Sequence, residues 1–92
     1  MRVYVDTEVV KKLGTTKAFV LEYIFTKAPH YNIQTKLNIS AISRDLPISL
    51  STVQRLMKQL EGEGYIKKHD TLYSLSEEFF KEFTDYQTYI YG

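Results

Sequence analysis

The stretch that most constrains the fold of this chain is residues 42–66, ISRDLPISLSTVQRLMKQLEGEGYI, in which two helical patterns are joined by a tight turn. In the second pattern, apolar residues recur at i, i+3, i+4 and i+7, namely Val53, Leu56, Met57 and Leu60. This spacing places the four side chains on one face of a helix, and that face must contact a core. We therefore expect a short helix, a turn and a longer helix anchored by its apolar face.

The other face of the longer helix is polar. The same spacing, displaced by two residues, selects four side chains that can hydrogen-bond, namely Ser51, Gln54, Arg55 and Lys58. A helix with one face in a core and a hydroxyl, an amide, a guanidinium and an ammonium on the other suits the major groove of DNA. Binding of double-stranded DNA is therefore the leading hypothesis.

Helix caps define the bounds of this pair of helices. Ser40 is a predicted N-cap for a helix that ends at Leu46, and Ser49 is a predicted N-cap for the longer helix, which runs to about Glu63. Gly64 is then expected in the left-handed conformation that often follows a helix.

Two further helices are predicted nearer the N-terminus. The first is a brief helix through Leu13 that Asp6 and Thr7 can cap, and Gly14 ends it. The second is capped by Thr15 or Thr16 and runs to about residue 27. This second helix is apolar around most of its circumference, which indicates burial on more than one side.

Short strands are expected at three places. Weak alternation over residues 1–5 and the sequence at residues 37–39 each predict a brief strand. Residues 65–69 and 72–75 are rich in aromatic and aliphatic side chains, and the intervening Asp70 and Thr71 favour a turn, so these two runs predict a β-hairpin.

A last helix is predicted over residues 76–91. Ser76 can cap it, and the two glutamates that follow oppose the positive end of the helix dipole. The apolar seam of this helix either forms a dimer interface with the helix over residues 15–27 or covers that helix within one chain. The predicted dimer interface comprises Phe19, Tyr23, Phe79, Phe83, Tyr86 and Ile90.

Taken in order, a helix, a short strand, a helix-turn-helix, a hairpin and a closing helix resemble the winged-helix superfamily, in particular its small prokaryotic and archaeal transcription regulators. The residues that carry the resemblance are Ile42-Ser43, Leu46, Ile48-Ser49, Ser51-Thr52-Val53, Leu56, Leu60-Glu61, Gly64-Tyr65-Ile66 and Tyr73-Ser74-Leu75-Ser76. The chain departs from the pattern at Pro47, where many such units have glycine, and at Ser43, where alanine is usual.

The fold class that we expect is therefore α+β and mostly helical, a winged helix-turn-helix with a β-hairpin wing and an extra C-terminal helix. A single domain is expected over residues 1–92, with the helix-turn-helix at 40–64, the wing at 65–75 and the dimerisation helix at 76–91.

The resemblance implies that the longer helix lies in the major groove of DNA and that the hairpin touches the neighbouring backbone or minor groove. The expected base contacts are Ser51, Gln54 and Arg55, because they lie in the first turns of this helix. Glutamine can pair with adenine and arginine with guanine. The expected contacts with the DNA backbone are Ser49, Thr52, Lys58, Lys67, Lys68 and His69.

Composition narrows the other classes of function. The chain has no cysteine, and its two histidines lack metal-ligand spacing, so neither a metal nor another cofactor is expected. No nucleophile elbow is present, and Gly62 and Gly64 close a helix rather than open a phosphate-binding loop, so an enzyme is not expected. No apolar run approaches the roughly 20 residues of a membrane span, and the N-terminus lacks a signal-peptide pattern, which favours a cytoplasmic location.

Charge leaves two kinds of partner open. The net charge is only +1, but residues 36–69 carry six basic side chains against three acidic ones. A basic centre is compatible with phosphate binding, so double-stranded DNA and a second copy of the chain are the expected partners. The alternative is a protein-interaction winged helix in a larger assembly, which the near-neutral charge and the eight tyrosines favour. The sequence does not identify a small-molecule effector.

Overall fold

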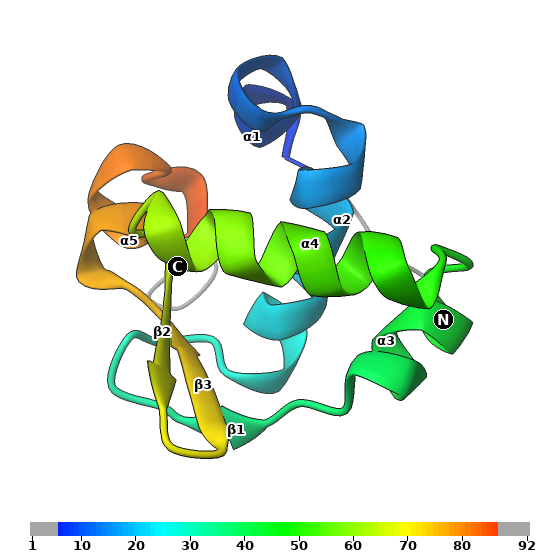
Figure 1. The fold of residues 1–92 in the computed structure, drawn as a ribbon. Coiled ribbons are helices and arrows are strands. Elements are labelled where there is room, and N and C mark those ends of the chain that lie inside the picture. The colour runs from blue at the N-terminus through cyan, green and yellow to red at the C-terminus, as the bar shows by residue number, and fades with distance from the viewer. Residues whose placement is uncertain (1–5, 87–92) are drawn as a thin grey trace.

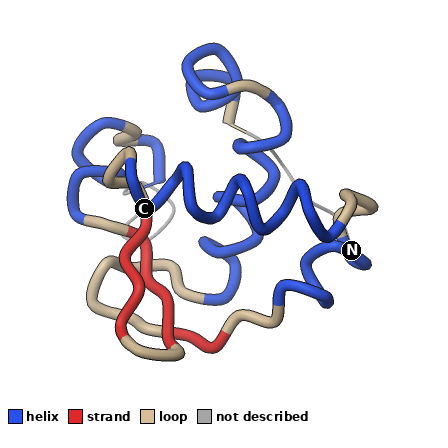
Figure 2. The backbone as a smooth tube through the Cα atoms, viewed as in Figure 1, coloured by secondary structure: helices blue, strands red, loops and turns tan. Residues whose placement is uncertain are grey.

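Five helices and a three-stranded antiparallel sheet make up residues 6–86, the part of the chain that the computed structural model describes (Figure 1). The elements are α1 (Thr7–Leu13), α2 (Thr15–Lys27), β1 (Thr35–Lys36), α3 (Ile39–Asp45), α4 (Leu50–Gly62), β2 (Ile66–His69), β3 (Leu72–Leu75) and α5 (Glu77–Glu82). The strands gather at one end of the molecule and the helices occupy the rest (Figure 2). The prediction of a mostly helical α+β chain is confirmed, and the strand predicted over residues 1–5 lies outside the described residues.

The sheet has the strand order β1-β3-β2, with both pairs antiparallel. The predicted hairpin is confirmed, and Asp70 takes a φ of 60° in its two-residue turn, a conformation that aspartate tolerates better than most residues. The strand predicted at residues 37–39 is wrong, because β1 ends at Lys36. Thr35 and Lys36 pair with β3, whereas Leu37 packs against the core.

Gly14 separates α1 from α2 and serves both helices. Of the two predicted caps of α1, Asp6 is the N-cap, with a side-chain oxygen 2.8 Å from the backbone nitrogen of Glu8, and Thr7 is the first residue of the helix. Gly14 then ends α1 at a φ of 92° and is also the N-cap of α2. The prediction that Thr15 or Thr16 caps α2 is therefore wrong, because the helix already begins at Thr15.

The cap of α3 also differs from the prediction. Asn38, not Ser40, is the N-cap, and its Oδ1 accepts hydrogen bonds from the backbone nitrogens of Ser40 at 2.9 Å and Ala41 at 3.2 Å. Asparagine is among the strongest N-caps, and here one side chain satisfies two amides that the helix itself leaves without partners. Consequently α3 begins two residues earlier than expected and ends one residue earlier.

The turn between α3 and α4 is stabilised by two hydrogen bonds between Ser43 and Ile48. The Ser43 hydroxyl donates to the carbonyl of Ile48, and the Ile48 amide donates back to the Ser43 carbonyl at 3.1 Å. Ser49 then caps α4 as predicted, and Gly64 has the expected positive φ of 86° just beyond the helix.

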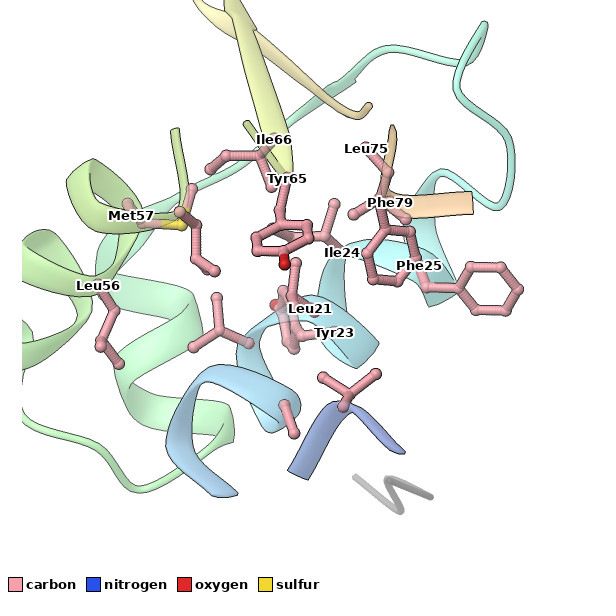
Figure 3. Close-up of a cluster of buried hydrophobic side chains, with 14 of the residues drawn as sticks. Leu21, Tyr23, Ile24, Phe25, Leu56, Met57, Tyr65, Ile66, Leu75 and Phe79 are labelled. Atoms are coloured by element: carbon pink, nitrogen blue, oxygen red, sulfur yellow. The ribbon is translucent and has the colours of Figure 1, made fainter. Parts of the chain in front are cut away.

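The core surrounds α2, which is buried on more than one side, as its composition indicates (Figure 3). Leu21 and Ile24 are fully buried between the apolar face of α4 and the base of the hairpin. The four side chains predicted for that face of α4 are all at most 5% exposed. Ile66, Leu75 and Phe79 complete the core from the sheet and α5.

The C-terminal helix is shorter than predicted. It ends at Glu82, and Phe83 leaves the helical conformation with a ψ of 77°, so the continuous helix predicted over residues 76–91 is wrong at residue 83. Phe79, Phe83 and Tyr86 are nevertheless buried, and the Tyr86 ring lies 4.7 Å from that of Phe25 on α2. This segment therefore covers α2 within one chain.

Four of the six side chains expected at a dimer interface, namely Tyr23, Phe79, Phe83 and Tyr86, are buried within the chain. Tyr23 is 3% exposed, and its hydroxyl donates to Asp45 at 3.0 Å. Phe19 is partly exposed, and Ile90 lies outside the described residues. Phe79, Phe83 and Tyr86 therefore cover α2 within one chain, which was the alternative to a dimer interface. A homodimer stays a prediction, and its interface would not include these three side chains.

Candidate nucleic-acid interface

The polar face of α4 is open to solvent. Figure 1 shows α4 lying across the front of the molecule, with the β2–β3 hairpin projecting from beside its C-terminal end. Ser51, Gln54, Arg55 and Lys58 are all exposed, as predicted. Within residues 6–86, the side chains of Gln54, Arg55 and Lys58 have no hydrogen-bond or ion-pair partner, so their donors are available to a ligand.

Ser49 and Thr52, two of the expected phosphate contacts, bind each other. The Ser49 hydroxyl accepts from the Thr52 backbone nitrogen at 3.3 Å and lies 2.7 Å from Thr52 Oγ1, to which it donates. The proton of Ser49 is thus used inside the helix cap. The hydroxyl proton of Thr52 stays available, which makes Thr52 the better phosphate donor of the two.

A groove of about 400 Å³ separates α4 from the hairpin and brings three predicted contacts together. Gln54 and Lys58 line its helix side, and Lys68 lines its hairpin side, where its Nζ lies 5.8 Å from the centre of the Tyr73 ring. The remaining lining residues are Ile39, Met57, Glu61 and Tyr73. Two cations on opposite walls of an open groove can contact one anionic strand.

Lys67 and His69 lie on the other face of the hairpin. Side chains alternate along a strand, so these two point away from Lys68 and from α4. They line a separate cavity of about 330 Å³ next to the loop after α2, where His69 Nε2 lies 3.3 Å from the hydroxyl of the buried Ser74. The three basic side chains expected to act together are therefore divided between two faces.

Several carboxylates near α4 are held by other side chains. Glu63 Oε1 lies 2.7 Å from Lys17 Nζ of α2, and Asp45 accepts the hydroxyl of Tyr23. Burial, reinforced by the hydrogen bond to Asp45 and by its charge, raises the pKa of Tyr23, so this hydroxyl stays a donor at neutral pH. Of the three acidic residues between Leu50 and Leu75, which are Glu61, Glu63 and Asp70, only Glu61 lines the groove, so the negative charge facing a ligand there is small.

The sequence identified the polar face of α4 but missed two of its neighbours. Tyr73 pairs with Lys68 across the hairpin, a register that follows from the two-residue turn once the strands are placed. Ile39 reaches the groove from the first residue of α3, which no local pattern predicts. Leu50, the first residue of α4, was also missed, and it is 44% exposed.

Comparison with known proteins adds no family to this description. No family model, curated protein or solved structure matches the chain. In the described part of the chain, no three His, Cys, Asp or Glu side chains gather where they could hold a metal ion. Between residues 6 and 86, none of the helices has both the length and the apolar character needed to cross a bilayer.

Proposed function

We propose that this chain is a winged-helix protein that binds double-stranded DNA at specific sequences and regulates transcription. The observation that carries the proposal is the exposed, unpartnered polar face of α4 beside a hairpin that bears lysines on both faces. The order of α2, β1, α3, α4 and the hairpin supports it, because this is the order expected from the resemblance.

In the proposed complex, the N-terminal half of α4 enters the major groove. Ser51, Gln54 and Arg55 then face the base edges, and Arg55 can make two parallel hydrogen bonds to guanine O6 and N7. Lys58 and Lys68 contact the phosphates of the strand that lies in the groove between α4 and the hairpin. Thr52 donates to a phosphate nearer the start of the helix.

Pairing of two copies on DNA is part of the proposal. A twofold arrangement would place two copies of α4 about 34–36 Å apart, one turn of DNA. Because Phe79, Phe83 and Tyr86 are buried within one chain, the contact between copies would use other surface.

Selection of bound duplexes from a random pool, followed by titration of the selected duplex with variants, tests the proposal. Arg55→Ala should weaken binding to the selected sequence by roughly tenfold or more and reduce its preference over a scrambled sequence. Lys68→Ala should weaken binding to both sequences alike and lower the slope of log affinity against log salt by about one.

The matched control is Lys11→Ala, which removes an exposed lysine of α1 at the other end of the molecule from the hairpin (Figure 1). It should bind both duplexes nearly as well as the wild-type chain. If Arg55→Ala and Lys68→Ala also bind like the wild type, the proposed interface is wrong.

The second candidate is a protein-interaction winged helix. Tyr31 and Ile33 favour it, because these neighbouring side chains of the loop after α2 are 38% and 42% exposed. Such a module should not bind any duplex from the pool at low salt, so the same selection separates the two candidates.

A further inference from the structure

Leu50 is a large apolar side chain on the part of α4 that the proposed function turns towards DNA. Within residues 6–86, the exposed large apolar side chains are Tyr31, Ile33 and Leu50, and only Leu50 lies on a helix. A single exposed leucine is ordinary on a protein surface. The position of Leu50 among the expected base contacts is what carries the inference.

Leu50 lies one helical turn before Gln54. Residues at i and i+4 share one side of a helix, so the isobutyl group of Leu50 and the free amide of Gln54 are neighbours. Ser49 caps the helix immediately before Leu50, which sets Leu50 at the very end of α4 that enters the groove in the proposed complex.

The edges of DNA bases offer a partner for each of the two side chains. In the major groove, adenine presents N7 and N6, which a glutamine amide can bind together, and thymine presents the apolar C5 methyl group. A leucine beside such a glutamine would leave its exposed apolar area in water unless a methyl group covered it.

We propose that Leu50 is a specificity-determining residue that contacts the methyl group of a thymine, next to an adenine bound by Gln54. The inference rests on the proposed function and names its target more closely, as a site that contains A·T pairs beneath the first turn of α4. Its chemical signature is dependence on a single methyl group.

Replacement of thymines by deoxyuridine tests the inference, because this change removes only the methyl group. In the selected duplex, replacement at one or two thymines should weaken wild-type binding by about fourfold, the effect expected for one buried methyl group. Leu50→Ala should bind the unmodified duplex about fourfold more weakly and should not respond to deoxyuridine at those positions. Alanine is favourable in helices, and Leu50 is outside the core, so this variant should keep the fold.

Ile33→Ala is the matched control, since Ile33 is 42% exposed in the loop after α2. It should respond to deoxyuridine as the wild type does. Three results would overturn the inference alone: no deoxyuridine effect in the wild type, an unchanged effect in Leu50→Ala, or a selected site without A·T pairs. If the chain binds no duplex, the proposed function fails first and the inference fails with it.

Discussion

The hydroxyl of Ser49 stabilises α4 before it can contact DNA. It accepts from the Thr52 backbone nitrogen and donates to Thr52 Oγ1. Removal of this hydroxyl would therefore weaken DNA binding through a loosened helix end. A substitution that separates this effect on the helix from the charge that faces DNA must keep the cap and change the charge.

Ser49→Ala should lower the free energy of unfolding by about 1 kcal/mol, because it removes the N-cap of α4. Ser49→Asp should keep most of that stability, since aspartate is an equally good cap, yet it should weaken DNA binding by placing a carboxylate near a phosphate. Urea denaturation measures the first effect and duplex titration the second. An alanine variant as stable as the wild type would contradict the capping role.

At the scale of single elements, the start of α3 depends on Asn38. Asn38→Ala should lower the free energy of unfolding by about 1 kcal/mol, because two backbone amides lose their acceptor. Ser40 lies two residues after Asn38 and is exposed. Ser40→Ala should therefore change the free energy of unfolding by less than about 0.5 kcal/mol, as exposed substitutions usually do. Urea midpoints of the two variants decide between the caps, and a larger loss for Ser40→Ala would restore the cap predicted from sequence.

Elements with strong local signals were predictable, and those defined by distant contacts were not. The apolar period of α4, its cap at Ser49 and the glycine after it are all local, and each was confirmed. The two-residue strand β1 exists only because it pairs with β3, nearly 40 residues later in the chain, and no local pattern marks its bounds. The end of α5 is similar, since Phe83 leaves the helix while remaining in the core.

The candidate site shows the same division. Exposure of Gln54 and Arg55 followed from the helical period alone. Strand alternation predicts that Lys67 and Lys68 point to opposite faces of the hairpin. Only the position of α4 on one side of the sheet shows that Lys68 is the lysine that lines the groove. The contribution of Ile39 required the position of α3 relative to the hairpin, which the sequence does not report.

At the scale of the whole molecule, Glu22 joins α2 to the C-terminal segment. The Tyr86 hydroxyl donates to Glu22 Oε2 at 2.8 Å across 64 residues of sequence. Burial raises the pKa of Glu22 above its ordinary value of 4.5; the hydrogen bond from Tyr86 opposes this rise, and the charge of Asp6 adds to it. The folded chain therefore favours the protonated carboxyl.

Because the folded-state pKa of Glu22 is raised, its contribution to stability is fully present below the unfolded pKa and is lost as the pH rises through the folded pKa. Glu22→Gln keeps an acceptor for Tyr86 and cannot ionise. It should be modestly more stable than the wild type at neutral pH, and the difference should shrink as the pH falls through the raised folded-state pKa and be nearly gone below about 4.5. Urea denaturation across this pH range measures it, and a wild type that is the more stable chain at neutral pH would contradict the expectation.

The burial of Phe79, Phe83 and Tyr86 against α2 has a consequence for synthesis. Ribosomes add about 5–20 residues per second, so α2 emerges several seconds before the segment that covers it. During that interval, Phe25 and its apolar neighbours on α2 have no cover from residues 79–86. In the nascent chain α2 is therefore open to chaperones and to other unfinished chains during this interval, and the core closes only after Tyr86 has emerged from the ribosome.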